Sequence, residues 1–243
     1  MRFFGGFRGS DFRRAFSALS RYAPFLRMRQ FQAVIFDMDG VIVDSEARHE
    51  RAFLDVVREI GYGDKLALRF ADYIGRSDQV LWVDFVARHK PPQTVAQLLV
   101  MKRDRMVELI RREQPLFDGL PALVEKLAAR YVLGVASGSE RAVVGEVLEI
   151  ERLGRFFGAV VTDSDIPHGK PAPDIFLRAA ELLKVPPQAC CVIEDSKPGV
   201  AAGLAAGMEV IAITNTHPAE ELQHATRVVQ TYQEIEHLLL QPH

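Results

Sequence analysis

The sequence predicts an α/β fold in which a doubly wound parallel sheet carries an inserted helical domain. From Gly119 to Ile213, short apolar runs alternate with stretches of helical spacing, and such repeated units build a parallel sheet with helices on both faces. Between Glu46 and about Gln114 the spacing is helical, and no strong strand pattern interrupts it. These observations indicate a Rossmann-like core and a separate helical insertion.

The first predicted strand ends in two carboxylates. Val34-Ile35-Phe36 is an apolar run typical of a strand buried on both faces, and Asp37-Met38-Asp39-Gly40 follows it directly. A carboxylate inside the sheet would be costly, so both aspartates should lie at the carboxyl end of the strand, facing a cleft. Two carboxylates so close repel each other unless a cation or a shared proton intervenes. The pair points to metal-assisted chemistry on a negatively charged group.

The helical insertion follows this strand. Helical spacing covers residues 52–60 and stops at Gly61, and further helical pattern covers residues 81–86 and 95–110. Trp82, the only tryptophan, is expected in the core of the insertion rather than as a platform for stacking a sugar. We place the insertion at residues 46–115, and the core at residues 31–45 and 116–243.

The core continues as alternating helices and strands. Cys190 and Cys191 are adjacent in one strand and cannot form a normal structural disulfide with each other, so we expect small buried residues in a reducing compartment. Helices are expected at residues 120–129, 140–150, 173–183 and 198–206, and strands at residues 132–136, 159–162, 190–193 and 210–213.

The composition excludes several function classes. With 243 residues, of which 48% are hydrophobic and 26% charged, the chain fits an ordinary globular protein with a full core. A net charge of -2 offers no case for a nucleic-acid partner. No apolar run approaches the roughly 20 residues that cross a bilayer. We expect a cytoplasmic protein, and we favour a monomer although no surface pattern settles the oligomeric state.

Residues 1–30 differ from the rest, because they contain seven arginines against a single acid, Asp11. This composition fits an organelle transit peptide or a membrane-surface helix. The alternative is an upstream extension, or a start codon placed too early, since Met28 stands just before the first strand. We favour the alternative over targeting.

Ser137-Gly138 directly follows the strand predicted at residues 132–136. A hydroxyl and free backbone N–H groups where a strand enters a helix suit a phosphate oxygen. The same residues also form ordinary turns and helix caps. Their position at the strand end on the Asp37 edge favours the functional interpretation.

Lys170 and the pair Glu194-Asp195 lie at the same predicted edge. Gly169 and two prolines restrain Lys170, which is either a solvated surface charge or a cation that offsets a nucleophilic aspartate and a bound phosphate. Asp195 or Ser196 could simply cap the next helix. As ligands, the carboxylates would instead complete an oxygen-rich site suited to Mg²⁺.

These four segments together resemble the haloacid dehalogenase superfamily, whose signature is Asp-x-Asp, then Ser or Thr, then Lys, then an acidic pair. The resemblance covers about residues 31–213, and the helical insertion is similar to the small helical cap of that superfamily. Residues 37–46, 169–174 and 194–196 are similar to its beta-phosphoglucomutase-like branch.

The resemblance implies that Asp37 attacks phosphorus and forms an aspartyl-phosphate, while Asp39 protonates the leaving oxygen and later deprotonates water. Ser137, Gly138 and Lys170 would hold the phosphoryl oxygens. An alkoxide leaving group needs the proton of Asp39 and a halide does not, so phosphoryl transfer is expected rather than dehalogenation.

A magnesium cofactor is also implied by the resemblance. Asp37, the backbone carbonyl of Asp39 and Asp195 would bind Mg²⁺, with Glu194 binding directly or through water.

The insertion should select the substrate. His49 is expected to face the acid/base aspartate, as relatives often carry histidine there. Arg76 could bind a second phosphate or a carboxylate of the substrate, and a plain surface arginine is equally consistent with the sequence. Lys102 and Arg103 are weaker candidates because their helix is heavily charged throughout.

The predicted function is a magnesium-dependent phosphatase for a small phosphorylated metabolite, such as a sugar phosphate or phosphoglycolate. A sugar phosphomutase of the beta-phosphoglucomutase type is the alternative. A catalytically idle binding module on the same fold is disfavoured, because the signature residues are all present.

Overall fold

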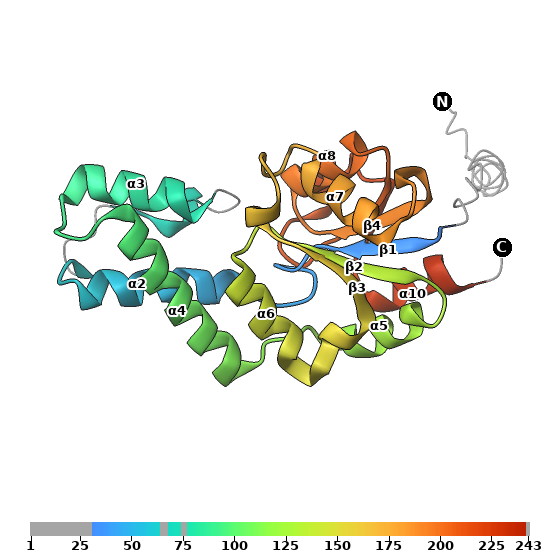
Figure 1. Cartoon of the computed structure of the whole chain (residues 1–243), viewed down its shortest axis with the longest axis horizontal. Helices are drawn as coiled ribbons and strands as arrows, with labels where there is room; N and C mark the ends of the chain where they lie inside the picture. Colours follow the sequence, from blue (N-terminus) through green and yellow to red (C-terminus); the bar gives the residue numbers. More distant parts are fainter. Residues whose placement is uncertain (1–30, 64–67, 74–76, 242–243) are drawn as a thin grey trace, which may run out of the picture. The chain divides into compact units, whose positions relative to one another are not determined.

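A parallel six-stranded sheet lies at the centre of the described chain, with strand order β3-β2-β1-β4-β5-β6 (Figure 1). The structure is a computed structural model, and it describes residues 31–63, 68–73 and 77–241. The strands are β1 (Ala33–Phe36), β2 (Val132–Ala136), β3 (Phe157–Val161), β4 (Cys190–Glu194), β5 (Glu209–Ile213) and β6 (Arg227–Val229).

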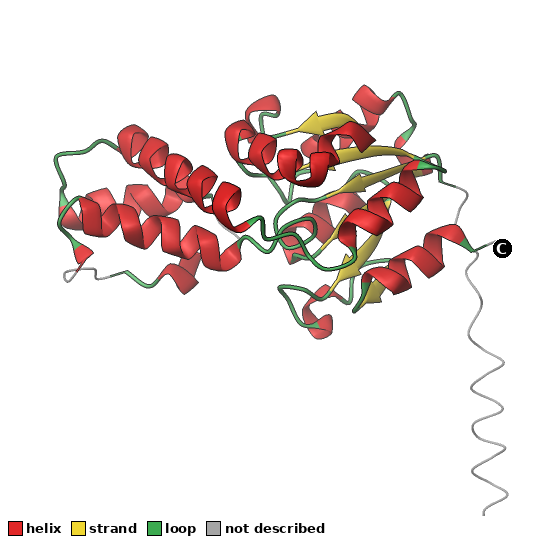
Figure 2. Cartoon of the chain, turned by 90° about the horizontal axis from the view of Figure 1, so that it is seen from below, coloured by secondary structure: helices red, strands yellow, loops and turns green. Residues whose placement is uncertain are grey.

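Helices cover both faces of this sheet (Figures 1 and 2). α7 and α8 pack on one face over a continuous apolar cluster, which includes Ile35, Phe176 and Val192. α5 and α10 contact each other on the other face. The helices of this part are α5 (Leu120–Ala128), α6 (Arg141–Glu149), α7 (Asp174–Leu183), α8 (Lys197–Ala205), α9 (Ala219–Leu222) and α10 (Tyr232–Leu240). The predicted α/β fold with a parallel sheet is confirmed.

The residues between β1 and α5 contribute only helices to the described part of residues 46–115. These are α2 (Glu46–Glu59), η2 (Phe70–Tyr73), α3 (Asp78–His89) and α4 (Val95–Glu113). They share their own apolar cluster, in which Trp82 is fully buried with its ring 4.9 Å from that of Phe53. The expectation that Trp82 is a core residue is confirmed, while the proposed boundaries of a separate cap domain stay a prediction.

Local sequence explains the ends of these helices. α4 starts after Pro91-Pro92 with a capping box, in which Thr94 and Gln97 bond each other's backbone N–H groups. The two connections to the core run side by side, since the Asp44 N–H donates to Pro115 O at 2.9 Å. Both entry and exit of the helical segment are therefore tied together.

For most predicted elements, both ends lie within two residues of the observed ends. Cys190 and Cys191 are buried free thiols in β4, as expected. Thr162 was expected in a strand but follows β3, where it bonds Asp165. β6 and α9 were not predicted, because elements of three and four residues leave no readable periodicity. α10, which has nine residues, was also not predicted.

Other predictions concern the whole chain. No helix in the described ranges is long and apolar enough to cross a membrane. The hypotheses about residues 1–30 fall outside the described residues, and the cytoplasmic location and monomeric state stay predictions.

Candidate active site

Asp37 lies at the middle of the carboxyl edge of the sheet. Phe36 is opposite Val135 of β2 on one side and Ile193 of β4 on the other. The Asp37 N–H donates to Ile193 O at 2.9 Å, so sheet pairing continues one residue beyond β1. The strand order reverses between β1 and β4, which is where doubly wound sheets bind their ligands.

Lys170 reaches this carboxylate from the loop before α7. Its Nζ donates to Asp37 Oδ1 and to Glu194 Oε1, each at 2.6 Å, and lies 5.1 Å from the ring centroid of Phe176. Burial disfavours the ammonium, but the charges of Asp37 and Glu194 outweigh burial and raise the pKa of Lys170. Lys170 is therefore a buried cation rather than a solvated surface charge.

Asp39 is held by four side chains. Its Oδ1 accepts a hydrogen bond from Ser45 Oγ at 2.6 Å and lies 3.3 Å from His49 Nε2. Its Oδ2 accepts from Ser139 Oγ at 2.7 Å and from Ser137 Oγ at 3.3 Å. Burial opposes ionisation, but His49, Ser45 and Ser139 outweigh it and hold the pKa of Asp39 well below its usual range. Asp39 is thus a stabilised carboxylate.

The orientation of His49 is set from α4. Lys102, which is 1% exposed, places its Nζ 3.0 Å from His49 Nδ1 and 2.5 Å from Asp78 Oδ1. An ammonium can only donate, so His49 Nδ1 must accept and His49 Nε2 carries the proton that points to Asp39. Lys102 therefore fixes the ring tautomer next to the predicted acid/base residue.

Glu194 and Asp195 have different surroundings at the end of β4. Glu194 Oε2 accepts from the Asp195 N–H at 2.8 Å and from the Ser196 N–H at 2.7 Å, while Oε1 accepts from Lys170. Ser196 Oγ caps α8 by accepting from the Gly199 N–H at 3.2 Å. Helix capping, the alternative role for this segment, thus falls to Ser196 and leaves Asp195 free of it.

Three of these carboxylates form a buried cluster that could hold a metal ion. Oxygens of Asp37, Glu194 and Asp195 all lie within 4.8 Å of one another. Burial, with the charges of Glu194 and Asp39, raises the pKa of Asp37 to about 7 against the opposing effect of Lys170. Burial and the carboxylates of Glu194 and Asp37 likewise raise the pKa of Asp195 to about 9. Such a site favours added positive charge, and its oxygen-only donors fit a hard divalent cation.

The family of the chain follows from a comparison with known proteins. The model of the haloacid dehalogenase-like hydrolases matches residues 31–207, which include Asp37, Ser137, Lys170 and Glu194. The chain belongs to this family of hydrolases.

Named relatives of this hydrolase include a phosphatase and a mutase. Hexitol phosphatase B of Escherichia coli is 34% identical over 83% of this chain and 90% of the relative. Beta-phosphoglucomutase of Mycobacterium bovis is 31% identical over 82% of this chain and 89% of the relative. Among solved structures, the CbbY protein of Rhodobacter sphaeroides in complex with xylulose 1,5-bisphosphate superposes with a TM-score of 0.74. It is 23% identical, with 84% of this chain and 96% of that chain covered, which supports the shared fold.

The hydrolase brings most of the predicted site residues together. The exposed Gly138 adjoins them, and its N–H has no acceptor within the described residues. Arg76 lies outside the described residues. The residues that share the site are Asp37, Asp39, His49, Ser137, Lys170, Glu194 and Asp195.

Three residues near the site were not predicted from the sequence, and all three follow residue 207, where the family match ends. Thr216 Oγ1 donates to Asp195 Oδ2, and Asn215 Nδ2 donates to Gly40 O at 2.8 Å. Tyr232 Oη donates to Val41 O at 2.6 Å. Asn215 and Thr216 follow β5 at the same sheet edge, so their polar side chains after an apolar strand were a usable signal.

Gly40 explains how this turn approaches Asp195. Its φ of +76° is a left-handed conformation that favours glycine, and a Cβ there would lie 1.9 Å from Asp195 Oδ2. The glycine after the Asp-x-Asp pair is therefore required by backbone conformation and by close contact.

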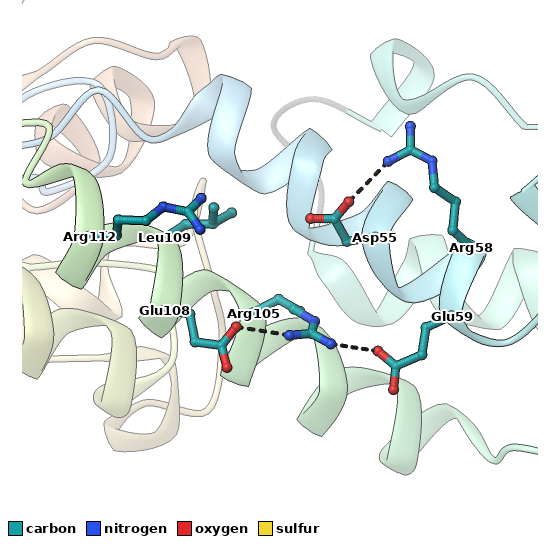
Figure 3. A pocket seen from close by; sticks show the side chains of 7 residues that line it. All are labelled: Asp55, Arg58, Glu59, Arg105, Glu108, Leu109 and Arg112. Carbon is teal, nitrogen blue, oxygen red and sulfur yellow. Dashed lines mark hydrogen bonds and ion pairs between the residues drawn. The ribbon is translucent and has the colours of Figure 1, made fainter.

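A separate hollow of about 470 Å³ lies between α2 and α4 of the hydrolase (Figure 3). Its charges largely pair with one another, since Arg105 bonds both Glu59 and Glu108 at 2.9 Å and Arg58 bonds Asp55 at 3.0 Å. It contains none of the residues that surround Asp37, so we do not place the chemistry there.

Proposed function

We propose that this hydrolase is a magnesium-dependent phosphatase for a small phosphorylated metabolite, of the sugar phosphate or phosphoglycolate type. The observation that carries the proposal is the buried Asp37 carboxylate, held by Lys170 on one oxygen and close to Glu194 and Asp195. The similarity to hexitol phosphatase B supports the choice of a phosphate ester.

Asp37 is the proposed nucleophile. Its Oδ1 is engaged by Lys170, while its Oδ2 has no hydrogen-bond donor within the described residues. Oδ2 attacks phosphorus, the bond from phosphorus to the ester oxygen breaks, and the phosphoryl group remains on Asp37 as an acyl phosphate. Water then attacks this phosphorus and releases inorganic phosphate with Asp37 restored.

Lys170 and the loop after β2 bind the phosphoryl oxygens. The ammonium offsets charge that develops during transfer, and the hydroxyl of Ser137 and the N–H of Gly138 donate hydrogen bonds. Lys170 is held in place by Glu194, whose Oε1 accepts from it at 2.6 Å.

Asp39 moves the protons. Its carboxylate form, stabilised by Ser45, Ser139 and His49, is the form required to accept a proton from the attacking water. In the first step it must carry a proton for the leaving oxygen. The negative phosphate entering beside Asp39 raises its proton affinity, which prepares it for that step.

Asp37 and Asp195 are the proposed direct ligands of Mg²⁺, together with the backbone carbonyl of Asp39. Both oxygens of Glu194 already accept hydrogen bonds, so Glu194 acts through Lys170 or through a water molecule. When bound, Mg²⁺ offsets the charge of the carboxylates and of the phosphate.

Phosphate release over a panel of phosphorylated metabolites tests the function, with Mg²⁺ and with EDTA. We expect hydrolysis only with the metal, and a loss of at least about 10³-fold in Asp37→Asn. Asp118→Asn, a change at an exposed residue outside the site, is the matched control and should retain full activity. If Asp37→Asn hydrolysed the ester at the wild-type rate, Asp37 would not be the nucleophile.

A beta-phosphoglucomutase-type mutase is the second candidate, because beta-phosphoglucomutase of Mycobacterium bovis is similar over most of its length. A mutase isomerises the sugar phosphate when primed with a bisphosphate, whereas a phosphatase releases phosphate. Following both products in one reaction distinguishes the two.

A further inference from the structure

The helical segment places an acid, Asp78, close to the candidate active site. Asp78 begins α3, and its carboxylate pairs with Lys102 Nζ, which also bonds His49 next to Asp39. Asp78 is therefore two side chains away from the proposed acid/base residue. Its side chain is 38% exposed, whereas that of Lys102 is 2% exposed, so the carboxylate rather than the ammonium meets the solvent.

Lys102 cannot serve as a free cation for a second anionic group. Its ammonium is buried and already donates to Asp78 and His49. A substrate group that approaches this part of the hydrolase meets a neutralised ion pair with its acidic partner outermost.

Two other acids adjoin residues that bond Asp39. Glu46 follows Ser45, and within the described residues it has no ion-pair partner. Glu140 follows Ser139, and among the described residues its ion-pair partner, Arg103 Nη1, is 4.0 Å away. Acidic side chains thus flank the proposed proton-transfer residue from α2 and from the start of α6.

The charge of Asp78 acts on Glu140 although the two residues come from different parts of the chain. Burial raises the pKa of Glu140, and the carboxylates of Asp163 and Asp78 raise it further against the effect of Arg103 and Lys102. Each of the two acids is linked to Asp39 by hydrogen bonds or by chain adjacency, Asp78 through Lys102 and His49, and Glu140 through its neighbour Ser139.

We propose that Asp78 is a specificity-determining residue that selects phosphate esters whose far end is uncharged, such as polyol or sugar monophosphates. This inference rests on the proposed phosphatase function. A second phosphate or a carboxylate on the substrate would find the ammonium of Lys102 already neutralised by Asp78, and the carboxylates of Asp78 and Glu140 would disfavour its negative charge. A hydroxyl-bearing chain can instead donate hydrogen bonds to these carboxylates. Asp78 would therefore make neutral-ended monophosphates better substrates than phosphoglycolate and sugar bisphosphates.

The test compares kcat/KM for sorbitol 6-phosphate and glucose 6-phosphate with kcat/KM for phosphoglycolate and fructose 1,6-bisphosphate. In the wild-type protein with Mg²⁺, we expect the neutral-ended esters to be favoured by at least about tenfold. In Asp78→Asn, the ratio of charged-ended to neutral-ended kcat/KM should rise about threefold or more, because Lys102 loses its acidic partner. The rise should shrink at high salt, which a purely structural effect would not produce.

Control variants make the outcome decisive. Asp55→Asn removes the same charge from the separate hollow shown in Figure 3 and should leave the ratio unchanged. If Asp78→Asn does not fold, Glu140→Gln removes the second acid and should move the ratio in the same direction. Preference of the wild type for charged-ended esters, or an unchanged ratio in a folded variant, overturns the proposal. Failure to hydrolyse any ester, including p-nitrophenyl phosphate, refutes the phosphatase function instead.

Discussion

Replacing the proposed nucleophile should stabilise the metal-free protein. In Asp37→Asn, one of the buried carboxylates becomes a neutral amide of nearly the same shape. Asp37 is 6% exposed, and burial with the charges of Glu194 and Asp39 raises its pKa from 3.8 to about 7. The ionised form is therefore disfavoured in the folded state, although catalysis needs it.

The pKa gives the size and the sign of this effect. The difference between a pKa of 3.8 in the unfolded chain and about 7 in the folded protein means that ionised Asp37 lowers the free energy of unfolding by at most about 4 kcal/mol. The folded state binds the proton of Asp37 more tightly than the unfolded state does. The stabilisation from this proton is therefore complete below pH 3.8 and is lost as the pH rises to about 7. We expect about half of the ceiling, roughly 2 kcal/mol, because an ionised carboxylate relaxes by admitting water. This corresponds to a Tm increase of about 4–8 °C for a domain of this size.

Thermal unfolding in EDTA at about pH 8 measures the Tm increase of Asp37→Asn over the wild type. This increase should roughly halve at about pH 5.5. Added Mg²⁺ should raise the Tm of the wild type much more than that of Asp37→Asn, because the variant lacks one proposed ligand. Asp118→Asn, which changes an exposed carboxylate, should have the Tm of the wild type both in EDTA and with Mg²⁺. A destabilised Asp37→Asn protein at pH 8, or a gain that does not depend on pH, would refute the reasoning.

Other substitutions test the surrounding residues. Lys170→Met should lower kcat/KM by about 10²–10³-fold in a phosphate-release assay, because it removes the buried cation beside the nucleophile; an activity near that of wild type would contradict its role. Thr216→Val should weaken Mg²⁺ binding about tenfold by calorimetry, since the hydroxyl no longer orients a metal-site carboxylate, and Thr216→Ser should restore it. Equal affinity in all three proteins would argue against this contact. Gly199→Ala should lower the Tm strongly, because a Cβ would lie 1.6 Å from Glu194 Oε1. Gly145→Ala, where a Cβ meets nothing within 4 Å, is the control, and similar Tm values for both would disprove the close contact.

Local patterns were sufficient for the order of the main elements. The apolar run ending in Asp37 placed β1 and its carboxyl edge, and α4 starts at the predicted residue, Val95, because caps and prolines act over a few positions. The short β6 was not predictable, because its three residues are specified by pairing with β5 rather than by their own pattern.

Charge patterns along one helix could not identify the lysine that matters. Lys102 belongs to a heavily charged stretch, so it was only a weak candidate for a site residue. The fold buries it because α4 packs against α2 and α3, where His49 of α2 offers an acceptor and Asp78 of α3 offers a counter-charge. Those partners are 53 and 24 residues away, so no local pattern contains the pairing.

The sequence by itself predicted the groups that we propose as reacting groups of this hydrolase, because Asp37, Asp39, Lys170 and the acidic pair occur in a specific order at strand ends. Parallel strands then bring such residues to one edge wherever they stand in the chain. Only the tertiary structure decided their protonation and their supports. It buried Asp37 beside two carboxylates, gave Asp39 four partners and brought Thr216 to Asp195. These properties depend on desolvation and on distances between side chains, which sequence order does not specify.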